Sequence, residues 1–109
     1  MTLNKMAKEC LQEFHHAGWD NTNLGELIAL IHCGLSEMLQ AERTGERDKH
    51  LPHRLAAEVE CADALTRLLI YAGFRGFDLD GAVAEKRAYN AEREDHKPEN
   101  RRKEGGKAF

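Results

Sequence analysis

The chain has 109 residues, of which 41% are hydrophobic and 32% are charged, values typical of one small globular domain. Its formal net charge of −3 argues against non-specific nucleic-acid binding, which depends on an excess of Lys and Arg. The three cysteines have no CxxC spacing, and there is no apolar stretch suited to a membrane span or a signal peptide, so we expect a cytoplasmic protein with no membrane partner.

Hydrophobic periodicity predicts a first helix over residues 3–16, ending near Gly18. Trp19 follows directly. Polar residues at positions 20–23 then offer N-caps for a longer second helix, which ends near Gly45. Its apolar stripe consists of Leu24, Leu27, Ile28, Ile31, Leu35 and Met38.

A third helix is expected over residues 55–72, with Gly73 ending it and a tight turn with buried aromatic residues following. Asp78 or Asp80 caps a fourth helix that runs to about residue 94. Residues 95–109 are polar and contain Pro and Gly, so we expect a tail without a core of its own.

No strand pattern is found, and the short loop between the second and third helices predicts antiparallel neighbours. The sequence therefore predicts an all-α, four-helix bundle over residues 1–94, followed by a polar tail over residues 95–109.

The third helix carries a narrow polar stripe of Glu60, Asp63 and Arg67 on an otherwise largely apolar circumference. Ionised groups that lose water are tolerated when they are paired or bind a metal. Two interpretations follow: an ion pair between Asp63 and Arg67 at i,i+4, or one half of a site for a hard cation.

Glu37 lies on the flank of the second helix's apolar stripe, where we expect it to be half-buried. Packed helices are about 8–10 Å apart, a gap that Glu37 on one helix and Glu60 with Asp63 on the next can bridge through one Mg²⁺. Lys86 and Asn90, at i,i+4 on the fourth helix, offer an ammonium and an amide for phosphate or sugar oxygens.

Four segments of the chain carry a family resemblance that extends over nearly its whole length: Ile31 to Leu39, Glu58 to Leu65, Glu85 to Asn90, and Gly105 to Lys107. The chain resembles the MazG-like branch of the all-α nucleoside triphosphate pyrophosphohydrolases. In that family an ExxE pair and an ExxD pair bind Mg²⁺, and the products are a nucleoside monophosphate and pyrophosphate.

The resemblance implies that Glu37 is the second acid of the first pair and that Glu60 and Asp63 form the second pair. It also implies substrate contacts by Lys86 and Asn90, and a phosphate-gripping role for Lys107. Gly34 stands where the family has the first Glu of the ExxE pair, so one metal ligand is missing.

We therefore predict a Mg²⁺-dependent nucleoside triphosphate pyrophosphohydrolase, with Mn²⁺ as an alternative ion. Glu37, Glu60 and Asp63 are its expected metal ligands and catalytic residues, and Trp19 is a candidate for stacking on the nucleobase. The apolar third helix favours a homodimer or a dimer of dimers. The other hypothesis is a nucleotide-binding or structural helical oligomer that lost the chemistry through Gly34.

Overall fold

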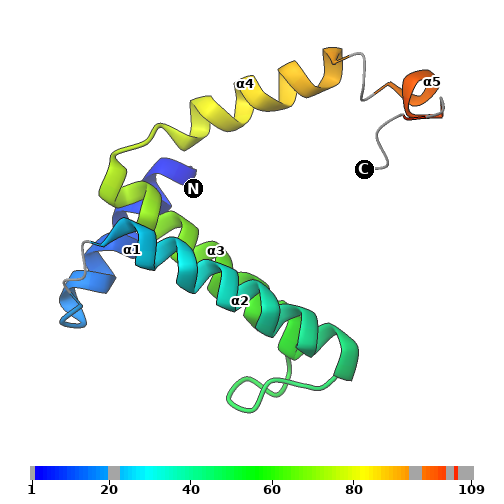
Figure 1. Cartoon of the computed structure of the whole chain (residues 1–109). Helices are drawn as coiled ribbons and strands as arrows, with labels where there is room; N and C mark the ends of the chain where they lie inside the picture. The colour runs from blue at the N-terminus through cyan, green and yellow to red at the C-terminus, as the bar shows by residue number, and fades with distance from the viewer. Residues whose placement is uncertain (1, 20–22, 94–96, 103–104, 106–109) are drawn as a thin grey trace. The chain divides into compact units, whose positions relative to one another are not determined.

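The computed structural model describes residues 2–19, 23–93, 97–102 and 105, and within these every regular element is a helix. The helices are α1 (Leu3–His16), α2 (Leu24–Thr44), α3 (Ala56–Arg75), α4 (Leu79–Glu92) and the four-residue α5 (Pro98–Arg101) (Figure 1). The predicted all-α class and its four main helices are confirmed for this part of the chain.

The chain divides into two compact units, Met1–Phe77 and Asp78–Phe109. In the first unit α3 packs against both α2 and α1. The second unit contains α4 and α5. The expected boundary at residue 94 lies within the second unit and stays a prediction.

In the first unit α2 and α3 run side by side in opposite directions, with the connecting loop at one end, as the loop length predicted (Figure 1). The buried hydrophobic residues come from all three helices. They are Ala7 of α1, Leu27 and Ile31 of α2, and Ala64, Leu69, Ile70 and Ala72 of α3.

The loop between α2 and α3 is held by its own hydrogen bonds. Gly45 ends α2 in the left-handed region (φ 65°), which glycine adopts without steric cost. The Oδ2 atom of Asp48 accepts hydrogen bonds from the backbone N–H groups of His50 (2.9 Å) and Leu51 (2.8 Å). These bonds fix the turn that returns the chain toward Leu55, the N-cap of α3.

Gly73 does not end α3, contrary to expectation. It lies inside the helix, where an added Cβ would be 3.0 Å from the backbone oxygen of Ala7 and 3.1 Å from the Cβ of Leu11. Glycine here permits close approach of α1. The helix ends at Gly76 (φ 65°), and Phe77 is 42% exposed instead of buried in a tight turn.

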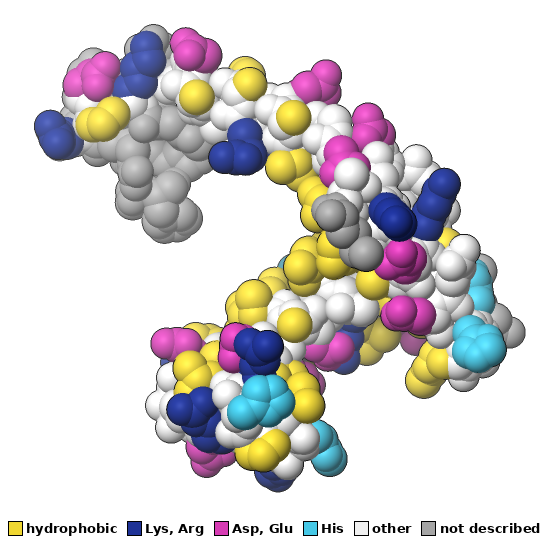
Figure 2. Space-filling view, turned by 180° about the vertical axis from the view of Figure 1, so that it is seen from behind, with side chains coloured by type: hydrophobic (Ala, Val, Ile, Leu, Met, Phe, Trp, Pro, Cys, Tyr) yellow, Lys and Arg dark blue, Asp and Glu magenta, His cyan; other side chains and the backbone are white. Residues whose placement is uncertain are grey.

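Large apolar side chains remain on the surface of this unit (Figure 2). Leu65 and Leu68 of α3 are each 46% exposed, so the largely apolar third helix is not enclosed within the single chain. None of the described helices combines the length and the apolar character that crossing a membrane requires.

Candidate functional site

Two carboxyl groups meet across the interface of α2 and α3. Glu37 lies toward the end of α2 and Glu60 near the start of α3, and these positions face each other because the helices are antiparallel. The two carboxyl groups are close enough for protonated Glu60 to donate a hydrogen bond to Glu37. Glu60 is half-buried, whereas Glu37 is exposed, contrary to the half-buried position expected for it. The fold thus brings together two of the three predicted acids.

The surroundings of Glu60 disfavour its negative charge. Partial burial raises the pKa of the Glu60 carboxyl, and the charges of Glu37 and Asp63 and the hydrogen bond with Glu37 raise it further. Arg67 has the opposite effect and lowers this pKa, but it does not cancel the rise. Ionised Glu60 is therefore held at a free-energy cost, which a cation beside it would reduce.

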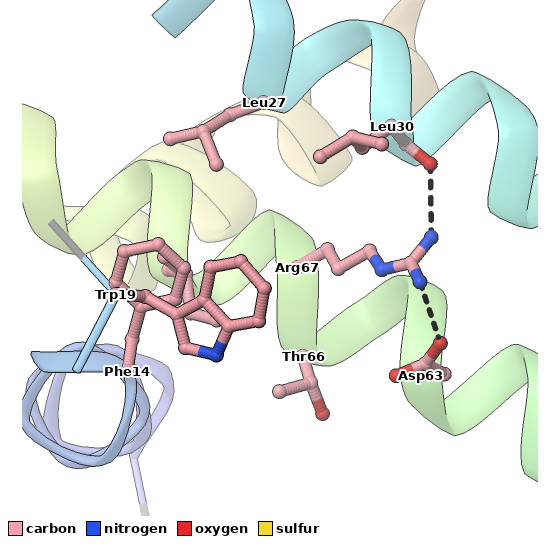
Figure 3. A pocket seen from close by; sticks show the side chains of 8 residues that line it. Phe14, Trp19, Leu27, Leu30, Asp63, Thr66 and Arg67 are labelled. Atoms are coloured by element: carbon pink, nitrogen blue, oxygen red, sulfur yellow. Dashed lines mark hydrogen bonds and ion pairs between the residues drawn. The ribbon is translucent and has the colours of Figure 1, made fainter. Parts of the chain in front are cut away.

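The third predicted acid, Asp63, is paired with Arg67. Its Oδ2 atom lies 3.2 Å from Nη2 of Arg67, in the i,i+4 ion pair that was one of the two predicted interpretations. Nη1 of Arg67 donates a 3.0 Å hydrogen bond to the backbone oxygen of Leu30. One guanidinium therefore ties α3 to α2, as the dashed lines in Figure 3 show.

Gly34 makes room for this guanidinium. A Cβ at position 34 would lie 3.1 Å from Nη1 of Arg67, closer than ordinary van der Waals contact. Gly34 is itself buried in the middle of α2. At the position where the resemblance leads one to expect another acid, the chain instead has space into which the arginine of the neighbouring helix extends.

Among the residues that the structure describes, no group of three or more His, Cys, Asp or Glu side chains is arranged to hold a metal ion. Asp63 is engaged with Arg67, while Glu37 and Glu60 meet each other. Mg²⁺ in proteins is commonly bound by one or two carboxylates together with waters and substrate phosphates. The oxygen donors of the Glu37–Glu60 pair fit that mode of binding.

A cavity of about 270 Å³ lies among α1, α2 and α3, and Figure 3 shows the side chains that line it. We call it the Trp19 pocket. Its lining combines an aromatic and aliphatic wall with one ion pair, and consists of Phe14, Trp19, Leu27, Leu30, Asp63, Thr66, Arg67 and Ile70. Asp63 belongs both to the pocket and to the group of acids around Glu60, so the pocket and the acid site adjoin.

Trp19 is held in place although its side chain is 63% exposed. Its ring stacks on Phe14 with centroids 6.3 Å apart and an interplanar angle of 24°. Its backbone N–H donates to the oxygen of Phe14 (3.2 Å), and its oxygen lies 3.3 Å from Nδ1 of His15. Phe14 also packs edge-on against Phe74 of α3, so it has a packing role between α1 and α3.

The other predicted substrate contacts lie elsewhere in the sequence. Lys86 and Asn90 are on α4, in the second unit, where Nζ of Lys86 lies 4.9 Å from the ring centroid of Tyr89. Oδ1 of Asn90 is buried and has no hydrogen-bond partner among the described residues. Lys107 lies outside the described residues, so its predicted role stays a prediction.

The structure adds Arg67 as a residue of the pocket, where the sequence suggested only an ion pair on one helix. Two signals for this were present: an unexplained glycine inside α2 and a lone arginine on the polar stripe of α3. Spacing along each helix could not show that Gly34 and Arg67 meet, because that contact depends on the register between the helices.

Comparisons of the chain with protein-family models, with curated protein sequences and with solved structures gave no match. The family resemblance therefore remains a prediction, and the chemistry is argued from the residues of the site.

Proposed function

We propose that this chain is a MazG-like, Mg²⁺-dependent nucleoside triphosphate pyrophosphohydrolase. The observation that supports this most directly is the meeting of Glu37 and Glu60, from two helices, in surroundings that raise the pKa of Glu60. Two carboxyl groups so close together repel when both are ionised. A divalent cation removes that repulsion and at the same time attracts a triphosphate.

Glu37 and Glu60 would hold the Mg²⁺ in this proposal. Asp63, whose Oδ2 pairs with Arg67, would turn its Oδ1 toward the ion as a third donor. When bound, the ion would neutralise phosphate charge and assist the attacking water. Mn²⁺ would serve as an alternative, because carboxylate and water ligands suit it as well.

The reaction would add a water oxygen to the α-phosphorus and break the bond to the bridging oxygen, so that pyrophosphate leaves with the electron pair. A carboxylate oxygen of Glu60 that does not contact the ion would accept the proton of that water. We further propose that Lys86, Asn90 and Lys107 contact the phosphates or the sugar.

The exposed apolar residues of α2 and α3 support assembly into a homodimer or a dimer of dimers, in which Leu65 and Leu68 would lose contact with water. As part of the same proposal, the enzyme works in the cytoplasm on small nucleotides and binds no nucleic acid, in line with its net charge of −3.

A panel of nucleoside triphosphates, incubated with the protein and Mg²⁺ and assayed for pyrophosphate, tests this proposal. We expect monophosphate and pyrophosphate in equal amounts from at least one nucleotide, and no turnover after EDTA is added. Orthophosphate as the first product, or turnover that persists in EDTA, would refute the mechanism.

A second candidate function is nucleotide binding without hydrolysis. It is favoured by one observation: the guanidinium of Arg67 extends against Gly34, where the resemblance calls for another acid. In that case the chain would bind nucleotides in the same panel and release no pyrophosphate with either Mg²⁺ or Mn²⁺.

A further inference from the structure

We propose that the Trp19 pocket holds the nucleobase of the substrate and that Arg67 selects bases with a ring carbonyl oxygen, against adenine, which has none. This inference rests on the proposed function, since it places the base of the same nucleotide whose phosphates would meet Glu37 and Glu60.

The walls of the pocket suit a flat, largely apolar ring. Trp19, backed by its stack on Phe14, forms one wall, and aliphatic side chains of Leu27 and Ile70 line the cavity as well (Figure 3). Stacking on an aromatic side chain is a common way to bind a base and is tolerant of its identity. The aromatic wall thus provides affinity but no choice among bases.

Arg67 supplies the polar contact that can discriminate among nucleobases. A guanidinium has five N–H donors and no acceptor. In Arg67, Nη1 donates to the backbone oxygen of Leu30 (3.0 Å) and Nη2 pairs with Asp63 (3.2 Å). The group is therefore held in a set orientation at the edge of the pocket, and its remaining donors can meet an acceptor on a bound ring.

Guanine and hypoxanthine present the carbonyl oxygen O6 beside the acceptor N7, a pair that arginine binds with two hydrogen bonds. Adenine has an amino group in place of O6, so its N–H donors would face the N–H donors of the Arg67 guanidinium. Uracil, thymine and cytosine also carry ring carbonyls. We therefore expect adenine nucleotides to bind least well.

The position of the pocket also suits a nucleotide. Asp63 lines it and is three residues from Glu60 on α3, a rise of about 4.5 Å along the helix. A base placed in the pocket can therefore extend its sugar and phosphates toward the Glu37–Glu60 pair.

The fluorescence of Trp19 tests the inference, because it is the only tryptophan of the chain. The wild-type protein is titrated with inosine monophosphate and with adenosine monophosphate in the presence of EDTA, and free N-acetyltryptophanamide corrects for light absorbed by the nucleotides. These two probes differ only in the carbonyl or amino group and in the associated ring proton. We expect quenching by both at high concentration, with binding of inosine monophosphate about tenfold tighter or more.

Arg67→Lys keeps the charge but loses the planar donor group, so the preference should fall to about twofold or less. Arg54→Lys is the matched control, because Arg54 also forms an i,i+4 ion pair, with Glu58, but does not line the pocket. This control should keep the wild-type preference. Should Arg67→Lys fail to fold by circular dichroism, the wild-type comparison still decides.

Equal affinity of the wild type for the two monophosphates would overturn the inference, as would calorimetric binding that leaves Trp19 fluorescence unchanged. The outcome is separate from that of the proposed function. A tenfold preference without pyrophosphate release supports the pocket and refutes the enzyme, whereas Mg²⁺-dependent hydrolysis of ATP and ITP at equal kcat/KM refutes the pocket and supports the enzyme.

Discussion

The two polar regions on α3, around Glu60 and around Arg67, differ in how their charges are balanced. Around Glu60, carboxyl groups from two helices meet, and their charges disfavour the ionisation of Glu60. One turn further along, Arg67 pairs with Asp63 and donates to the Leu30 oxygen, and its guanidinium fits against Gly34. The carboxyl groups around Glu60 therefore need a cation from solution, whereas Asp63 already has the guanidinium of Arg67. The second region is thus suited to keep a fixed geometry.

The largest effect should come from removing a carboxylate of the first region. In Glu37→Gln we expect pyrophosphate release to fall by more than about 100-fold. Loss of a residue that only hydrogen-bonds to a metal ligand typically lowers activity or metal affinity about 10–100-fold, and Glu37 is proposed to bind the metal directly. Glu58→Gln is the control, because Glu58 lies on α3, the helix of Glu60, but is paired with Arg54. Initial rates on the best substrate measure both, and equal rates for the two variants would contradict the assignment.

Arg67→Met tests whether the second region holds the two helices together. It removes the hydrogen bond to Leu30 and the ion pair with Asp63, so we expect a loss of about 1–2 kcal/mol in the free energy of unfolding, allowing for partial solvent exposure. Arg54→Met removes an exposed i,i+4 pair and should cost no more than about 0.5 kcal/mol. Urea denaturation compares them, and a loss in Arg67→Met no greater than in Arg54→Met would show that the bridge adds little.

Gly34→Ala is a smaller change that tests whether the Arg67 guanidinium needs the space at Gly34. Alanine in a helix interior gains up to about 1 kcal/mol over glycine, but here its Cβ would press on Nη1 of Arg67. At Gly25 an added Cβ would meet only Oδ1 of Asn23 at 3.5 Å, an ordinary contact. We expect Gly25→Ala to raise the melting temperature more than Gly34→Ala does. The reverse order in thermal melts would mean that Arg67 moves aside without cost.

The smallest effect concerns pH in the absence of metal. Because the pKa of Glu60 is raised by folding, the folded state binds this proton more tightly than the unfolded chain does, and stability falls as pH rises from the ordinary glutamate range through the raised pKa. Glu60→Gln stays neutral throughout, so it should melt above the wild type at neutral pH and lose this advantage in acid. An advantage of the same size at both pH values would contradict this origin.

Local patterns predicted the helices well. The apolar period and the caps placed α1 and the end of α2 correctly, because both depend on neighbours in the sequence. Gly73 misled the prediction, because its function is to let α1 approach α3, and a contact between distant segments leaves no mark in the local pattern.

The site was predictable only in part, for the same reason. Antiparallel pairing was enough to bring Glu37 opposite Glu60, since a short loop fixes which ends of two helices meet. The contact of the Arg67 guanidinium with α2 at Gly34 was not predictable, because it depends on the rotation and register of α2 relative to α3. The Trp19 pocket also needs α1, α2 and α3 together, so Trp19 could be proposed for base stacking but not placed beside an arginine.

The central claim is that Glu37 and Glu60 together bind one divalent cation with the nucleotide. Titration of Mn²⁺, followed by the loss of its electron paramagnetic resonance signal in the presence of an α,β-methylene nucleoside triphosphate that cannot be cleaved, tests it most directly. We predict one bound ion per chain in the wild type and in Glu58→Gln, and its loss in both Glu37→Gln and Glu60→Gln. Equal Mn²⁺ binding by all four proteins, or by none, would contradict the account.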